Sequence, residues 1–492
     1  MNDEKRTDNG LKRQLNPLHV WAIAFGCIIG WGSFINPGKK FLPNSGVSGS
    51  AVAMVLGALV MIVIAFSYAY MVPKHPKAGG EFNFTKICFG KNMAYFCGWF
   101  LVAGYLTNVP MNSTAIGLIV DGLDGSADIL KLGFHYTVAG FDIYLGEMLF
   151  AMLILVLFGF LNIVGVKKAG FVQTVLAVLL GVSVFTLTIA AVFSDKAVLE
   201  NMYPLWGFDK VAAVAAYKSG AFTAIDPFAH MGGMGIVSAV LATFAIAPWA
   251  YVGFDTIPQA AEEFKFSYQK VSFIMIIAII FGCFVYTANN TIAAAAVNKW
   301  PELIVGSAGT PWLLLIAAEC LLGTFGKVLV GVAVSCAVLS GIMGFYLASS
   351  RLMYAMSCEG YLPKWFGEID EKYGTPKNSL LFCIAISLSG PILGREALGW
   401  FVDMSAIGAS IAYFFTCAST LVTLKREGEN NAFLRIMAWI GVLFSISFVV
   451  LQLVPIPGLS GVHFGTESYI MLVIWIAIGL VFYGKQRKFF EN

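Results

Sequence analysis

Long apolar stretches without charged residues recur twelve times along the chain, and short polar segments separate them. Each stretch is long enough to cross about 30 Å of hydrocarbon as an α-helix. We therefore expect an all-α integral membrane protein with 12 transmembrane helices. The expected spans lie near residues 18–41, 47–72, 93–120, 145–165, 169–193, 233–261, 271–297, 323–356, 378–394, 398–424, 433–455 and 467–484. A thirteenth apolar segment, residues 310–323, is short and carries Glu319, so we expect a helix on the membrane surface.

Two of the expected spans contain residues that interrupt helices. The first holds AFGCIIGWGSFINPG at residues 24–38, and the sixth holds FAIAPWAYVGFDTIP at residues 244–258. Glycine inside a helix costs roughly 1 kcal/mol relative to alanine, and proline costs more. Interrupted spans one and six, five helices apart, are typical of two inverted five-helix repeats whose broken helices meet near the bilayer midplane. This placement favours a secondary transporter.

Composition agrees with a membrane protein. The chain is 58% hydrophobic and 12% charged, whereas soluble domains carry about 25% charged residues. The formal net charge of +3 gives no indication of a nucleic-acid partner. No CxxC pair occurs among the nine cysteines, and the five histidines are scattered singly, so we expect no metal site and no cofactor.

The distribution of basic residues predicts the orientation. If the N-terminus is cytoplasmic, 22 of the 31 Lys and Arg residues fall on the inner side. Because cytoplasmic loops carry an excess of Lys and Arg, we expect a multi-pass protein of the cell membrane with both termini cytoplasmic.

The interruptions have a chemical use. An unwound segment leaves backbone N–H and C=O groups that lipid cannot satisfy, so it is tolerated only around a polar cavity or ligand. Gly30 and Gly32 would let the backbone approach a ligand closely. Free N–H groups at the start of the resumed helix would bind a carboxylate, and carbonyls of the sixth span would suit an ammonium group. The alternative is that Gly26 and Gly30 form a GxxxG face for helix packing.

Four segments carry a resemblance to a known family. GCIIGWGSF (residues 26–34) resembles the G-x-x-x-G-x-G-x-F segment of the amino acid–polyamine–organocation (APC) superfamily permeases. Their remaining characteristic segments are similar to residues 68–84, 349–366 and 402–426. The sequence departs from the family at Trp31, where a small residue is usual, and at Ser357-Cys358, where an Arg-Asp-like pair is common.

The resemblance implies a LeuT-like bundle of ten helices in two inverted repeats, plus two peripheral helices. The implied units are a cytoplasmic tail (1–17), a first repeat (18–193), an extracellular loop (194–232), a second repeat (233–424), and peripheral helices with the cytoplasmic C-terminus (425–492). It also implies a substrate site in which Trp249 is an aromatic gate and Asn108 and Phe345 match pocket positions of the arginine/agmatine exchangers. Backbone groups and one hydroxyl would come from Ile28, Ile29, Gly30, Trp31, Gly32, Ser33, Ala247 and Val252.

Single polar residues leave alternatives open. Asp255 follows a long uncharged run, and an ionisable group at such depth is a candidate for function, here proton coupling; it could equally be a structural acid bound to N–H groups freed by the break. Asn108 could line the pocket or join helices, and Arg351 could meet headgroups or the Glu262–Glu263 pair. Ser335 and Ser340 are weak candidates for a sodium site.

We therefore expect a secondary active transporter that moves a small amino acid or related amine by alternating access, by exchange or by proton-coupled symport. The alternative is a permease for a polyamine or an ethanolamine-type organic cation. A channel would need a repeated filter sequence, which the sequence lacks. A membrane-embedded hydrolase using Ser33 would need a histidine within an apolar span, and of the five histidines only His19 touches one, at the edge of the first. The expected partners are the small-molecule substrate, the lipid bilayer and a coupling proton, and a homo-oligomer is left open.

Overall fold

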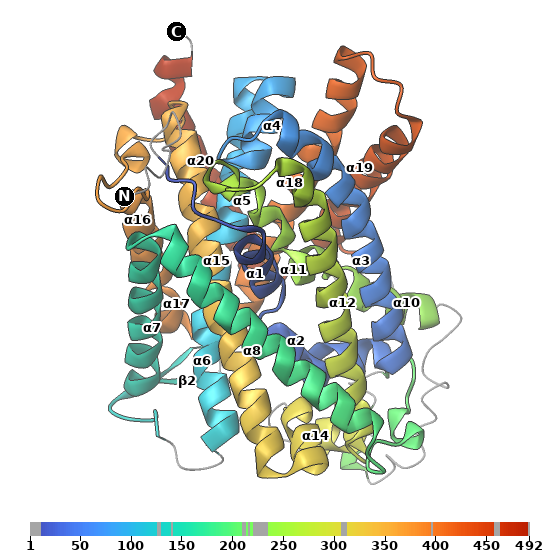
Figure 1. Cartoon of the computed structure of the whole chain (residues 1–492). Helices are drawn as coiled ribbons and strands as arrows, with labels where there is room; N and C mark the ends of the chain where they lie inside the picture. The colour runs from blue at the N-terminus through green and yellow to red at the C-terminus, as the bar shows by residue number, and fades with distance from the viewer. Residues whose placement is uncertain are drawn as a thin grey trace.

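Helices form almost all of the computed structural model, which Figure 1 shows as a bundle of long, roughly parallel helices. The structure describes residues 11–124, 129–138, 141–208, 213–214, 217–219, 235–306, 312–394, 397–456 and 463–490. The expected tail falls outside these residues at positions 1–10, and about half of the expected loop falls outside them, at 209–212, 215–216 and 220–232. The same holds for residues 233–234 of the sixth span, residues 310–311 of the thirteenth segment and the last two residues.

The chain order of the elements follows the predicted spans. The α-helices are α1 (Pro17–Ile28), α2 (Gly32–Asn36), α3 (Leu42–Lys74), α4 (Gly80–Phe89), α5 (Lys91–Leu106), α6 (Asn108–Asp124), α7 (Leu145–Ile163), α8 (Val166–Val192), α10 (Gly235–Phe244), α11 (Ala247–Tyr251), α12 (Val271–Ala295), α13 (Trp300–Gly306), α14 (Leu313–Leu322), α15 (Thr324–Cys358), α16 (Lys377–Ser387), α17 (Gly390–Leu393), α18 (Ala397–Arg426), α19 (Ala432–Leu453) and α20 (Thr466–Phe490). A π-helical turn covers Pro37–Phe41, and 3-10 turns cover Leu199–Met202, Phe254–Thr256, Pro258–Glu263, Tyr268–Lys270 and Lys364–Gly367. The antiparallel strands β1 (His135–Val138) and β2 (Phe141–Tyr144) form a hairpin, with His135 opposite Tyr144.

Every one of the twelve predicted stretches contains helix in the structure. Eight helices of the described part are long and apolar enough to cross a membrane by length and composition. The shorter pieces arise because the expected spans one, three, six and nine are each divided, for example at Thr107 between α5 and α6. The chain is therefore a predominantly helical, multi-pass membrane protein.

Local sequence explains the ends of α1 and α3. Asn16 caps α1 because its side chain accepts from the His19 N–H at 2.8 Å, and Pro17 occupies the first helical position. The sequence placed a connection between residues 41 and 47, but α3 begins earlier, at Leu42, and is kinked at Gly46. Gly46 has a φ of +66°, which favours glycine.

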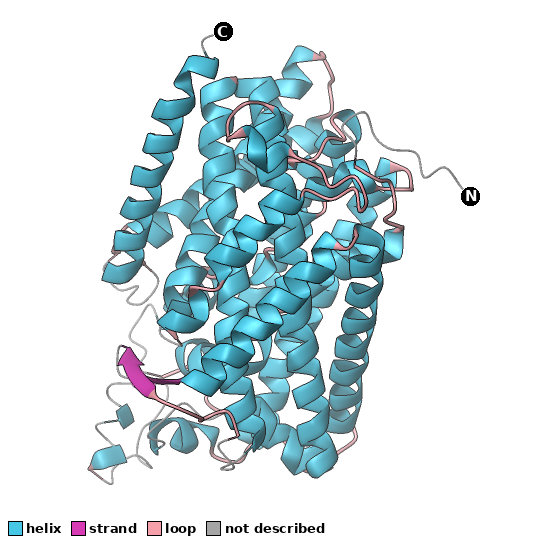
Figure 2. Ribbon diagram, turned by 90° about the vertical axis from the view of Figure 1, so that its left-hand side faces the viewer, coloured by secondary structure: helices cyan, strands magenta, loops and turns pink. Residues whose placement is uncertain are grey.

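Different elements lie at the two ends of the helix bundle. The helix α4 lies at one end, together with the C-terminal end of α20, while α14 and the hairpin lie towards the other (Figures 1 and 2). Helix α19 lies at the edge of the bundle in Figure 1, and α20, which leads to the C-terminus, lies at the edge in Figure 2. The edge helix α20 is joined to α5 by Trp99 and Trp475, whose rings stack 4.6 Å apart.

An N-terminal segment and a buried ion pair close the α4 end. The N–H groups of Gln14 and Leu15 both donate to the Glu263 carbonyl at 2.9 Å, and Lys265 N–H donates back to the Leu15 carbonyl at 2.9 Å. On α15, Arg351 donates to Glu263 Oε1 at 2.9 and 3.2 Å, with both side chains fully buried. Of the two alternatives for Arg351, the contact with the glutamate pair is confirmed.

Candidate functional site

The two interrupted spans meet at their interruptions. Gly253, which follows α11, has a φ of +144°. A Cβ at Gly253 would lie 2.5 Å from the Ile28 N atom, 2.8 Å from Cys27 Cβ and 2.9 Å from the Ala24 carbonyl oxygen. Only a glycine therefore lets the sixth span contact the last turn of α1.

The first break exposes a run of backbone donors. Helix α1 ends where Ile29 N–H bonds the Phe25 carbonyl at 2.9 Å, and α2 begins at Gly32. Among the described residues, the N–H groups of Gly30, Trp31 and Gly32 have no hydrogen-bond acceptor. Ser33 caps the segment, since its Oγ donates to the Gly30 carbonyl at 3.1 Å. Gly30 is half-buried, whereas Trp31 and Gly32 are buried. Unpaired N–H groups are usual at the start of a helix, and here three adjacent donors are available to an acceptor.

The glycines of the first span have different roles. A Cβ at Gly26 would lie 2.5 Å from Gln173 Nε2 and 2.7 Å from Ser340 Cβ. This glycine therefore packs α1 against α8 and α15, as the packing alternative expects of it. A Cβ at Gly30 would meet only Asn112 Oδ1, at 3.6 Å, whereas one at Gly32 would overlap the Trp249 ring. Gly30 thus has room beside it, and Gly32 lies under an indole.

Two indoles lie beside the first break. The rings of Trp31 and Trp249 are 6.2 Å apart and tilted by 52°. Both side chains are buried, and the Trp31 Nε1 has no hydrogen-bond partner among the described residues. The structure therefore brings together Trp31, Gly32 and Trp249, as the resemblance implies for a covered site.

The sixth span breaks twice. Ala247 begins the short helix α11, and Val252 ends it by donating its N–H to the Pro248 and Trp249 carbonyls at 3.1 and 3.2 Å. Three residues further on, Asp255 Oδ1 accepts the Gly253 N–H at 2.7 Å. This contact is the one expected of a structural acid at a helix break.

The remaining residues predicted for the substrate or sodium site contact other parts of the protein. Asn108 donates to the Gly104 carbonyl at 2.6 Å and to Ser405 Oγ at 2.7 Å, which is the alternative of joining helices. Phe345 packs 6.3 Å from the Tyr105 ring. Ser340 donates to the Gly26 carbonyl at 3.1 Å, while Ser335 lines a groove with Lys327 and Leu339. The two candidate sodium ligands are thus separated.

Three polar residues near the first break escaped the sequence reasoning. Asn112 is buried, and its Oδ1 has no partner in the described part of the chain. Asn289 donates to the Ser33 carbonyl at 3.1 Å, and Tyr286 donates to the Ile28 carbonyl at 3.4 Å. Asn112 follows Asn108 by four residues, so it extends the same helix face; that spacing is the signal that could have found it.

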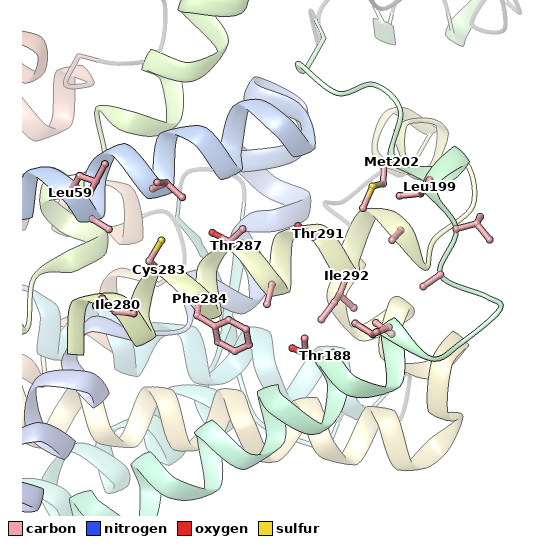
Figure 3. A pocket seen from close by; sticks show the side chains of 18 of the residues that line it. Leu59, Thr188, Leu199, Met202, Ile280, Cys283, Phe284, Thr287, Thr291 and Ile292 are labelled. Atoms are coloured by element: carbon pink, nitrogen blue, oxygen red, sulfur yellow. The ribbon is translucent and has the colours of Figure 1, made fainter. Parts of the chain in front are cut away.

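A larger groove lies away from the breaks. Its volume is about 790 Å³, and α3, α8, α12 and the turn Leu199–Met202 surround it (Figure 3). Most of its lining residues, such as Leu59, Ile280 and Phe284, are apolar. Among the described residues that line it, Cys283 alone carries an ionisable group, so the groove suits hydrocarbon better than a charged solute.

Comparisons with known proteins agree along almost the whole chain. A family model described as amino acid permease matches residues 15–482. The branched-chain amino acid permease BcaP of Bacillus subtilis (strain 168) is 25% identical, with 97% of this chain and 93% of the relative aligned. The serine/threonine exchanger SteT of the same organism is 24% identical over 87% of each chain. Cationic amino acid transporter 4, vacuolar, of Arabidopsis thaliana is 25% identical over 84% of this chain and 62% of its own length.

Proposed function

Because the chain belongs to the amino acid permease family and is a transporter rather than an enzyme, we propose that it carries a small amino acid through the contact between its two broken spans. The observation that carries this proposal is the run of three N–H donors at Gly30–Gly32, held beside Trp249. Such donors bind a carboxylate without a charged side chain.

The substrate's two charged groups have separate places. We assign the carboxylate to the N–H groups of Gly30, Trp31 and Gly32, helped by the Ser33 hydroxyl. The ammonium group belongs near the carbonyls of Ile28, Ala247 and Val252 and near Asn112 Oδ1, which has no partner among the described residues. A carbonyl or amide oxygen binds an ammonium through hydrogen bonds.

Size restricts the substrate. The Trp31 and Trp249 rings are 6.2 Å apart and the Trp249 ring covers Gly32, so the room for a substrate is confined to the side of Gly30. A small zwitterion fits this space better than arginine, lysine or a long polyamine. A dibasic substrate would also need a second acidic partner for its distal charge. By their names, BcaP acts on branched-chain amino acids and SteT on serine and threonine, whereas the Arabidopsis relative acts on cationic amino acids.

The transport cycle requires an arrangement that we also propose. Twelve spans would form two inverted five-helix repeats and two peripheral helices, with both termini cytoplasmic in the cell membrane. The α4 end would then face the cytoplasm. Alternating access around the paired breaks would drive either exchange or proton-coupled symport.

Uptake into proteoliposomes tests the proposal. The purified protein is supplied with labelled L-alanine, L-serine, L-valine, L-leucine, L-arginine and spermidine, under sodium, proton and internal-substrate gradients imposed separately. We expect saturable uptake of one or more of the small amino acids. A preference for arginine or spermidine would refute the size argument, and the absence of saturable uptake of every compound would refute the proposed function.

A further inference from the structure

A second carboxyl group lies beside Asp255. Glu81, near the start of α4, and Asp255 are both fully buried. The Tyr105 hydroxyl of α5 joins them: it lies 3.4 Å from Glu81 Oε1, 3.1 Å from Asp255 Oδ2 and 2.8 Å from the Asp255 carbonyl oxygen. This single O–H group therefore faces three acceptors on two acidic residues.

The groups that face the pair carry no positive charge. They are Tyr68 from α3, Tyr105 and Cys97 from α5, Tyr413 from α18, Cys27 from α1, and Gln259 from the turn Pro258–Glu263. Among the described residues, neither acid has a salt-bridge partner, because the buried Arg351 pairs with Glu263 instead. Two ionised carboxylates buried together without a cation repel each other and pay a large desolvation cost.

The Gln259 side chain can form a hydrogen bond with the Glu81 carboxyl group in either of its protonation states. Its Nε2 lies 2.5 Å from Glu81 Oε2, and its Oε1 has no partner among the described residues although the side chain is fully buried. The amide group donates to an ionised carboxylate, and after a half-turn its oxygen accepts from a protonated one. The nearby Tyr413 hydroxyl is also buried and without a partner in the described part.

We propose that Glu81 and Asp255 form one proton-binding site, in which the two carboxyl groups share a proton with the help of Tyr105. This inference rests on the proposed function and selects proton-coupled symport over pure exchange. The pair takes a proton from water when the site is open to one side, and returns it to water on the other side. No other bond is made or broken.

The geometry connects this proton to the substrate site. Asp255 Oδ1 accepts the Gly253 N–H at 2.7 Å, and Gly253 lies against Ile28 at the end of α1. A change in the charge of Asp255 therefore alters the hydrogen bond that positions Gly253, the residue of the sixth span that packs against the first. Protonation and substrate binding are linked through Gly253, and linkage is reciprocal.

The experiment follows substrate and proton in the same vesicles. Wild type, Glu81→Gln, Asp255→Asn and Tyr105→Phe are reconstituted with a pH-sensitive dye inside and tested on the amino acid that the wild type takes up fastest. Asp403→Asn is the matched control, because this carboxyl group, bound to Ser468 on α20, is outside the pair. Exchange at equal pH on both sides is measured in parallel.

We expect wild-type uptake to acidify the lumen and to rise with external acidity, by up to about tenfold per pH unit for a single proton. In Glu81→Gln and in Asp255→Asn, the rise in uptake per pH unit should be less than about twofold, while exchange at equal pH is kept. The neutral amide imitates the protonated carboxyl group but cannot bind and release a proton. Tyr105→Phe should shift the pH profile, and Asp403→Asn should keep the wild-type profile.

Several results would refute the proposal that Glu81 and Asp255 form one proton-binding site. Wild-type pH dependence in Glu81→Gln would show that Asp255 acts alone or not at all. Exchange without any proton dependence in the wild type would refute this inference while leaving the proposed function intact, whereas a lack of both uptake and exchange would refute both. If an amide variant does not fold, Glu81→Asp and Asp255→Glu keep the carboxyl group and move it, and an unchanged pH profile in both would also refute the pair.

Discussion

Replacing Gly32 by alanine tests the contact between the two broken spans. The added Cβ would overlap the Trp249 ring and would lie 3.1 Å from Asn36 Nδ2. Trp249 belongs to α11 and is almost fully buried, so its indole has little freedom to move aside. The substitution should therefore separate the two breaks or force Trp249 out of its position.

The size of the effect follows from overpacking. Inserting a methyl group into a packed interior typically costs about 1–3 kcal/mol, and about 1.4 kcal/mol corresponds to a tenfold change in an equilibrium constant. Because the clash is present with and without substrate, we expect its cost in the stability of the ligand-free protein in detergent, where the ratio of folded to unfolded protein should fall by roughly fivefold to 150-fold.

The matched control is Gly30→Ala. Its Cβ would meet only Asn112 Oδ1, at an ordinary 3.6 Å, so the ligand-free protein should keep its thermal stability while substrate binding weakens. Thermal unfolding and equilibrium binding of the transported amino acid are measured for both variants. A second check is a double-mutant cycle with Trp249→Leu: because this buried indole is itself part of the packing, Gly32→Ala should cost less stability in the Trp249→Leu background than in the wild type. Wild-type stability in Gly32→Ala, or an equal cost in both backgrounds, would refute the packing argument.

Three further predictions concern the membrane topology, the substrate selectivity and the Arg351–Glu263 ion pair at the α4 end. A single cysteine placed at position 135 should react with a membrane-impermeant reagent on intact cells, and one at position 10 should not; the reverse result would invert the orientation. Trp31→Ala should admit longer amino acid side chains in a competition panel, and an unaltered ranking would mean that this indole only packs. Arg351→Ala should lower stability in detergent by about 3–5 kcal/mol because it leaves Glu263 buried and unpaired, and adding Glu263→Ala should recover part of that loss; equal losses in the single and double variants would count against the ion pair.

The helices were predictable from the sequence because hydrocarbon permits few alternatives. A chain that crosses lipid must satisfy its backbone internally, so uncharged length identifies helices such as α12 (Val271–Ala295) closely. The same argument cannot find the kink at Gly46, since this depends on contacts with residues 205–207 far along the chain. The resemblance to the permease family, stated from four short segments, is confirmed by the match along residues 15–482.

The candidate site was predictable only in part. The breaks at Gly30 and Gly253 follow from local sequence, because glycine and proline act locally. The partners of a side chain are not local, which is why Asn108 could not be assigned to Ser405 and why Glu81 was missed beside Asp255. Glu81 lies 174 positions from Asp255 and looks like an ordinary acidic residue near a helix start. Its importance comes from burial, which a single sequence does not display.

The contacts at the α4 end restrict how the molecule can open. The first and sixth spans are tied twice, by Gly253 against Ile28 and by the backbone bonds between Leu15 and the Glu263–Lys265 segment. The sixth span is joined to α15 by a different kind of contact, the buried ion pair between Glu263 and Arg351. To separate the first and sixth spans, several backbone hydrogen bonds would have to break, and each would leave a polar group without a partner. The ion pair is a single contact, and water can replace both of its partners in one step. We therefore expect the broken spans to move as one unit, with opening at the α4 end beginning where Arg351 leaves Glu263.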